Sequence, residues 1–189
     1  QQAAPHLNVK VVLDSVPNLI QKLRNREIHF ALTGSTKEVP KIRSIPLFDE
    51  EFVFVSLTGS KHVAKEQISI KEIKEIPLLM PENDTSVFEV INTYLQNAGI
   101  LPCVAMENIS ADIIKNFLLQ DAGSAFLLKF TVQSMLETDT FQKIRIAEGA
   151  PTITFSLAFL DEKHLVKEVS SLIPVLEKMK LQRSDLIAV

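Results

Sequence analysis

Apolar and polar residues alternate along the chain with two periods, one typical of helices and the other of strands. Helical spacing predicts helices at 15–26, 86–98, 110–123, 131–136 and 165–179, with short helical pieces around 70–73. Apolar runs predict strands at 7–13, 28–33, 42–48, 52–57, 77–80, 103–106, 125–128, 141–146 and 153–160. Because strands and helices alternate with short connections, the pattern predicts an α/β fold with mostly parallel sheets.

Polar residues that favour helix N-termini follow three of the predicted strands. Asp14 and Ser15 precede the first helix, Ser86 with Glu89 has the spacing of a capping box, and Ser110 precedes a later helix. A helix N-terminus offers free N–H groups and a partial positive charge, so it is a ready site for an anion. If two of these ends converge, the expected guest is a small carboxylate, sulfate or phosphate. The alternative stays open that they are ordinary caps without a ligand.

The composition is that of an ordinary folded domain. Of the 189 residues, 46% are apolar and 23% are charged, and 20 Lys+Arg against 23 Asp+Glu give a net charge of −3. This balance argues against a nucleic-acid-binding surface on this segment. Cys103 is the only cysteine, which excludes an intrachain disulfide and suits a reducing compartment, and we expect it to be buried. No apolar run is long enough to cross a bilayer and no signal peptide is visible, so we expect a cytoplasmic chain without a membrane partner.

Motifs of known catalytic chemistry are missing from the sequence. It contains no P-loop, GxGxxG, GxSxG, HExxH or CxxC pattern, and its four histidines stand far apart. Scattered histidines and a single cysteine give no spacing for metal ligands. The acidic run 49–51 is interpreted as a solvated turn between two strands. We therefore expect no catalytic residue, no metal and no cofactor.

Four stretches resemble the effector-binding domain of LysR-type transcriptional regulators. Residues 18–34 resemble its "L...L..G.lDlai" segment, and residues 45–55 resemble its "pL..e.lvlv" segment. Residues 62–79 are similar to "HPLA...isl.dL...pli", and residues 107–128 are similar to "e....v..lVaaGlGia.lP". Each motif is loose, but their order agrees with the family over nearly the whole chain.

Some positions depart from the family pattern. His29 stands where the family usually has Asp, Leu128 stands where Pro is common, and 25–27 lacks the usual Gly. These departures bear on the identity of the ligand more than on the fold. The family's winged helix-turn-helix, its linker helix and the first strand of its effector domain would all precede Gln1.

The resemblance implies the type 2 periplasmic-binding-protein fold, in which two Rossmann-like α/β lobes hold an effector between them. Lobe I is expected at 1–57 plus 156–189 and lobe II at 58–155. The implied partner is a small-molecule effector, a carboxylate or other anion, with DNA bound only through the missing N-terminal domain. A homodimer or tetramer is expected. Carried over by position, the effector-binding residues are Asp14, Ser15, Thr33, Gly34, Asn83, Asp84, Ser110 and Phe126.

Other functions of the same fold stay open from the sequence. A solute-binding protein of a transporter would share the fold and would carry an export signal. An enzyme on this fold would need a converging acid–base or nucleophilic pair, and none is evident. A ligand-free dimerisation module would have an apolar cleft without converging hydrogen-bond donors.

Overall fold

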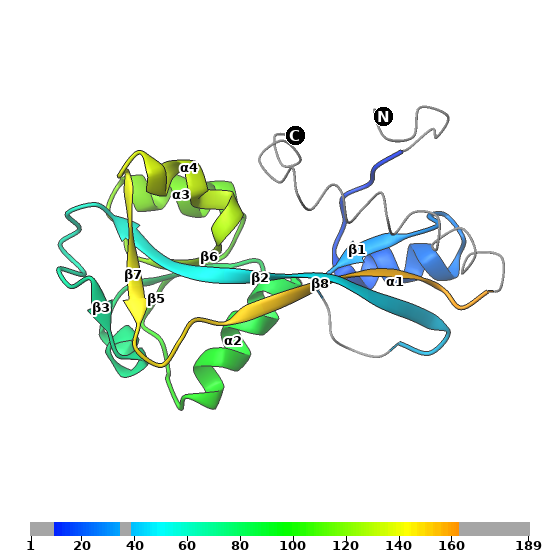
Figure 1. The fold of residues 1–189 in the computed structure, drawn as a ribbon, viewed down its shortest axis with the longest axis horizontal. Coiled ribbons are helices and arrows are strands. Elements are labelled where there is room, and N and C mark those ends of the chain that lie inside the picture. Colours follow the sequence, from blue (N-terminus) through cyan, green and yellow to red (C-terminus); the bar gives the residue numbers. More distant parts are fainter. Residues whose placement is uncertain (1–9, 35–38, 163–189) are drawn as a thin grey trace. The chain divides into compact units, whose positions relative to one another are not determined.

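The chain divides into two compact units, which are described one at a time. The structure, a computed structural model, describes residues 10–34 and 39–162, so the helix predicted at 165–179 lies outside it. Unit 1 consists of Gln1–Phe48 and Thr154–Val189, and unit 2 consists of Asp49–Ile153. Two strands, β2 (Ile42–Leu57) and β8 (Thr152–Leu160), therefore run through both units (Figure 1). The predicted lobe boundaries lie further along these two strands and stay a prediction.

Unit 1 packs one helix against a short antiparallel strand pair. Its helix is α1 (Val16–Arg24), and β1 (Ala31–Thr33) pairs antiparallel with β8. Leu23 of α1 is fully buried and packs with Ala31 and Ala158 from the two strands. The apolar positions of α1 that the helical period predicts therefore face the strands, as the pattern requires.

Unit 2 contains the remaining helices and strands of the described chain. In chain order these are β3 (Gln67–Ile68), the 3₁₀ helix η1 (Ile70–Glu75), β4 (Leu78–Pro81), α2 (Ser86–Asn97), β5 (Val104–Ile109), α3 (Ala111–Leu119), β6 (Ala125–Leu128), α4 (Lys129–Glu137) and β7 (Phe141–Ile146).

Strand pairing in unit 2 places β4 between β5 and β6. β4 and β5 are parallel, and a parallel bridge from Leu78 to Ser124 joins β4 to the start of β6. β2 pairs antiparallel with both β6 and β7, and β7 pairs parallel with β3. In Figure 1, α2 lies on one side of these strands, and α3 and α4 lie together on the other.

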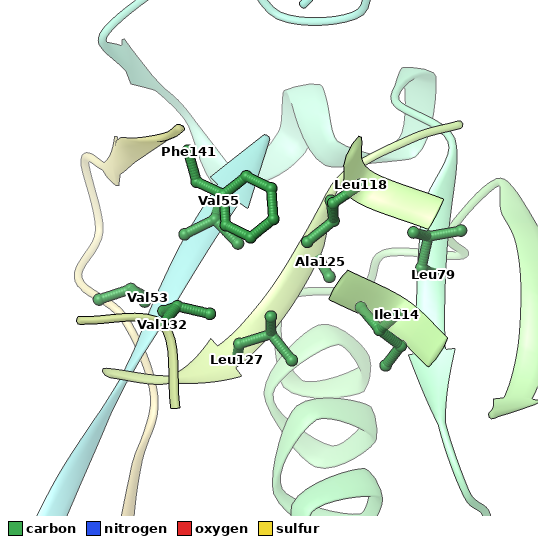
Figure 2. Close-up of a cluster of buried hydrophobic side chains, with 9 residues drawn as sticks. All are labelled: Val53, Val55, Leu79, Ile114, Leu118, Ala125, Leu127, Val132 and Phe141. Carbon is green, nitrogen blue, oxygen red and sulfur yellow. The ribbon is translucent and has the colours of Figure 1, made fainter. Parts of the chain in front are cut away.

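The core of unit 2 lies between the strands and the helix pair α3 and α4. Figure 2 shows the side chains of β2, β6 and both helices pointing toward one another. Alternate residues of each strand enter this core, because successive side chains of a strand point to opposite faces. The cluster consists of Val53, Val55, Leu79, Ile114, Leu118, Ala125, Leu127, Val132 and Phe141. On the opposite face, Phe126 packs with Phe54 and with Tyr94 of α2.

The predicted α/β class is confirmed, but the sheets are not mostly parallel. β8 pairs antiparallel with β1, and β2 pairs antiparallel with β6 and β7, because β2 and β8 carry the chain out of unit 1 and back. The predicted turn at 49–51 is also wrong. β2 continues through it as a single strand of 16 residues, and Glu50 is buried. The Glu51 carboxylate forms ion pairs with Lys129 and Lys143. These two ammonium groups compensate the negative charge that Glu51 brings into the strand.

Two further predictions are wrong: a strand over residues 10–13, and the burial of Cys103. No strand forms over residues 10–13, where Val11 is 77% exposed and Leu13 is 89% exposed. A strand needs a neighbour to satisfy its backbone, and the described residues provide none there. Cys103 is exposed rather than buried, because it precedes β5, which pairs only with β4 among the described strands.

Candidate functional site

Three helices of unit 2 begin at the same edge of its parallel strands. In β4 and β5, Pro81 lies opposite Ile109, so both strands end together. α2 follows β4, α3 follows β5, and α4 follows β6, which the bridge at Ser124 makes parallel to β4. We call residues 82–86, 108–111 and 128–129 the carboxyl edge. In open α/β sheets this is the edge at which ligands bind.

The N-terminus of α2 is capped by Thr85. Its hydroxyl accepts a hydrogen bond from the Phe88 amide at 3.1 Å and donates one to the Glu82 carbonyl at 2.7 Å. The N-cap is therefore Thr85 and not the predicted Ser86, and the predicted capping box is wrong, because the third residue of the helix is Phe88, whose side chain cannot accept from the cap. Thr85 is the residue with extended backbone just before the helix, so only its hydroxyl reaches the amide three positions on.

The N-terminus of α3 is capped by Ser110, as the sequence predicts. The Ser110 hydroxyl accepts from the Ile113 amide at 3.5 Å, a long hydrogen bond. Asp112 lies in the first turn and pairs with Lys115 at 2.6 Å. The hydrogen bond from Lys115 lowers the pKa of Asp112, so this carboxylate stays charged beside the positive end of the helix.

The loop before α2 is joined to β5 by a hydrogen bond. The Asn83 amide donates to Oδ1 of Asn108 at 3.3 Å. Asp84, the next residue, is exposed. Asn108 was not among the predicted site residues, although the loop at 108–110 follows a predicted strand. The signal that could have found it is an asparagine at a strand end, a residue that tolerates left-handed backbone.

Phe126 lies in the interior of unit 2. It is 1% exposed, and its ring centroid lies 4.8 Å from that of Phe54 and 5.6 Å from that of Tyr94. Phe126 thus packs between the strands and α2.

The predicted residues of unit 1 lie at the start of α1 and at the end of β1. Asp14 accepts hydrogen bonds from Lys22 and Asn18, both at 2.7 Å, and from the Ser15 amide at 2.9 Å. The Lys22 hydrogen bond, with those from Asn18 and Ser15, lowers the pKa of Asp14 to about 2. Ser15 is the N-cap residue, but its side chain makes no capping hydrogen bond. Thr33 is buried and lies opposite Ser156 of β8.

The structure therefore brings some of the predicted residues together. Asn83, Asp84 and Ser110 meet at the carboxyl edge of unit 2, whereas Phe126 lies inside that unit. Within unit 1, Asp14 and Ser15 directly precede α1. Thr33 is the last residue of β1, and Gly34, which follows it, is buried. In the part of the chain that the structure describes, no group of three or more His, Cys, Asp or Glu could hold a metal ion. No helix of that part combines the length and apolar character needed to cross a membrane.

Two α/β units joined by two shared strands, with helices that start at a common strand edge, define a two-lobed ligand-binding fold. The chain belongs to the LysR substrate binding domain family, which matches residues 1–180. The resemblance seen in the sequence is thereby confirmed, as is the type 2 periplasmic-binding-protein fold. This family belongs to transcriptional regulators and not to enzymes.

Similar proteins include regulators from several organisms. A "Probable RuBisCO transcriptional regulator" of Thalassiosira pseudonana is 24% identical over 88% of this chain and 57% of its own length. The Corynebacterium glutamicum OxyR C206 mutant has a TM-score of 0.83 at 16% identity and covers 96% of this chain and 57% of its own. The Synechocystis PCC6803 CcmR regulatory domain in complex with 2-PG has a TM-score of 0.78 at 16% identity. The match covers 92% of this chain and 86% of the CcmR domain. The chain thus spans little more than half the length of the first two.

Proposed function

We propose that this chain senses a small anionic effector and relays its binding to a DNA-binding domain elsewhere in a longer protein. The observation that carries the proposal is the common starting edge of α2 and α3 in a LysR substrate binding domain. Each helix N-terminus presents backbone N–H groups and partial positive charge to that edge. The 2-PG complex of the CcmR regulatory domain supports a small-molecule effector for a domain of this fold.

The proposed effector contacts come from both units. In unit 2 they are Asn83, Asp84 and Ser110, with Phe126 as an apolar contributor. In unit 1 they are Asp14, Ser15, Thr33 and Gly34. Within these sets the hydroxyls of Ser15 and Ser110 can both donate to an anion, because Ser15 makes no capping hydrogen bond and Ser110 uses only an oxygen lone pair in its cap. The charge of Asp14 is already compensated by Lys22, so Asp14 is proposed to accept from the effector rather than repel it.

The carboxylates at the site narrow the proposed effector class. Asp84 is exposed at the carboxyl edge, and a purely anionic molecule would be repelled by it. An effector with hydroxyl or amino groups beside its anionic group would donate hydrogen bonds to Asp84 while its anion meets the helix amides. We therefore expect hydroxy acids to bind better than the corresponding simple acids.

In the proposed mechanism the effector changes the arrangement of two regulatory lobes, 1–57 with 156–189 and 58–155. A ligand shifts such an equilibrium only by its difference in affinity for the two arrangements. Paired copies in a homodimer or tetramer would pass this shift to the DNA-binding domains of the longer protein. A cytoplasmic location is part of the same proposal. The family match favours this regulator function over the solute-binding alternative.

The test is a thermal-unfolding screen of the chain with small acids at millimolar concentration. The panel pairs hydroxy acids with simple acids, such as malate with succinate, and adds amino acids and inorganic anions. A ligand at 100 times its Kd adds about 2.7 kcal/mol of stability, which gives a readable shift in Tm. Ser15→Ala and Ser110→Ala should reduce that shift. Ser134→Ala is the matched control, because Ser134 is an exposed serine inside α4 rather than at a helix N-terminus.

The proposal is wrong if no anion raises Tm, either in this chain or in a longer chain that includes the preceding residues. A hit that is equally strong in Ser15→Ala, Ser110→Ala and Ser134→Ala would leave the effector in place and overturn the assigned residues. Equal shifts in Tm with malate and succinate would overturn the expected preference for hydroxy acids over simple acids.

A further inference from the structure

Asn108, at the end of β5, has an unusual backbone conformation and a side chain that is hydrogen-bonded to the loop before α2. Its backbone has φ 60°, in the left-handed region, although it lies within strand β5. Its side-chain oxygen accepts the hydrogen bond from the Asn83 amide across the carboxyl edge. Left-handed backbone is uncommon for residues other than glycine, and asparagine is among the few that adopt it readily.

The left-handed residue coincides with a bulge in β5. Leu79 pairs with Met106 and Pro81 pairs with Ile109, so two steps along β4 match three steps along β5. Between Met106 and Ile109, Glu107 and Asn108 match the single residue Met80 of β4, and a second register shift lies between Leu78 and Leu79. A bulge bends its strand and redirects the side chains near it, and bulges are frequent beside binding sites.

We propose that Asn108 is a positioning residue that fixes the start of α2 relative to the start of α3. The inference rests on the proposed function, since it concerns the geometry of the same anion site. Asn83 lies in the loop that ends at Thr85, the N-cap of α2, and Asn108 lies two residues before Ser110, the N-cap of α3. The hydrogen bond from Asn83 to Asn108 therefore joins the two helix N-termini on which the effector's anion is proposed to bind.

Its two features can be separated by substitution. Asn108→Gly keeps the left-handed backbone and removes the acceptor, whereas Asn108→Asp keeps an acceptor oxygen and tolerates the same backbone. Asn116→Ala is the matched control, because Asn116 is an exposed asparagine in the middle of α3. Thermal unfolding of each variant shows first that it is folded.

The experiment measures two quantities by NMR on the whole chain: the exchange rate of the Asn83 amide, and the affinity for inorganic phosphate as the probe. We expect Asn108→Gly to raise the Asn83 exchange rate by about twofold to tenfold, the range that the net free energy of one hydrogen bond gives. The phosphate affinity should fall by a similar factor. Asn108→Asp should keep the slow exchange of wild type, and Asn116→Ala should change neither quantity.

Different results overturn different statements. An unchanged Asn83 exchange rate in Asn108→Gly would overturn the positioning role, and so would a fast rate in Asn108→Asp. A loss of phosphate affinity without faster exchange would mean that Asn108 contacts the anion directly, which also overturns it. If wild type binds neither phosphate nor any panel anion while Asn108→Gly still speeds exchange, the proposed function fails and the link between the helix starts stands.

Discussion

Replacing Gly123 by alanine tests the close approach of β6 to the residue before β4. Gly123 is buried, and a Cβ added to it would lie 2.5 Å from the carbonyl oxygen of Pro77 and 3.1 Å from its carbonyl carbon. The shorter distance falls about 0.9 Å below the 3.4 Å at which ordinary contact begins. The same carbonyl accepts from the Ser124 amide at 2.8 Å, and the Leu79 amide donates back to the Ser124 carbonyl at 2.9 Å. The added methyl group would therefore push apart the contact that joins β4 to β6.

Gly123→Ala is expected to lower the free energy of unfolding, whereas a Gly→Ala substitution without a clash raises it. At a position without a clash, Gly→Ala stabilises by about 0.4–1 kcal/mol, because the unfolded chain loses freedom. Overpacking costs about 1–3 kcal/mol, and the stretched Ser124 hydrogen bond adds about 1 kcal/mol. The balance for Gly123→Ala is a destabilisation of about 1–3.6 kcal/mol, measured by urea unfolding.

A second glycine separates this clash from a backbone effect. Gly99 has φ 68° and nothing within 4 Å of its added Cβ, so Gly99→Ala has only the left-handed penalty of about 1–2 kcal/mol. Hydrogen exchange should be faster at the Leu79 and Ser124 amides in Gly123→Ala and unchanged there in Gly99→Ala. If Gly123→Ala is as stable as wild type and both amides exchange as before, the close approach is refuted.

Three further outcomes follow from hydrogen bonds of the structure. The Asp14 carboxyl should titrate with a pKa of about 2 by NMR, and Lys22→Ala should bring that pKa back toward 3.8. Because the pKa of Asp14 is lower in the folded state, the carboxylate stabilises the fold above pH 3.8, and this contribution is lost as the pH falls through 2. Ser124→Ala leaves the fully buried Ser56 hydroxyl without its 2.5 Å partner and should cost about 1–3 kcal/mol in urea unfolding, while adding Ser56→Ala should recover part of this loss. Asp121→Ala removes the acceptor of the buried Ser60 hydroxyl and places alanine at a left-handed backbone position with φ 52°, so in urea unfolding it should cost about 1–3 kcal/mol for the hydrogen bond and about 1–2 kcal/mol for the backbone. Asp121→Asn keeps an acceptor oxygen and tolerates that backbone, so it should cost less.

Local patterns were sufficient to predict most of the helices. The apolar stripe of α1 and the Ser110 cap of α3 involve residues within one or two turns of each other, so the sequence contains their signal directly. The cap of α2 shows the limit of such a signal. Thr85 and Ser86 are both good N-cap residues, and only the extended backbone of Thr85 decides between them.

Long-range pairing decided the features that were predicted wrongly. Glu51 is acidic and adjacent to two other acids, which is typical of a turn, yet Lys129 and Lys143 from distant elements compensate it within β2. Asn108 was missed for the same reason. Its bulge is defined by the register of β5 against β4, and an apolar pattern in β5 alone contains no information about register.

The discontinuity of unit 1 has a consequence for the order in which the protein folds during synthesis. All of unit 2 is one contiguous stretch, Asp49–Ile153, whereas unit 1 pairs Ala31 with Ala158 across that whole stretch. The strands and helices that belong wholly to unit 2 therefore emerge from the ribosome before β8 does. Unit 2 can fold with contacts that are closer in sequence, while β1 waits for its partner strand. Nascent chains stalled at the point where unit 2 has emerged from the ribosome and β8 has not are thus expected to hold a protease-resistant unit 2 beside an unfinished unit 1.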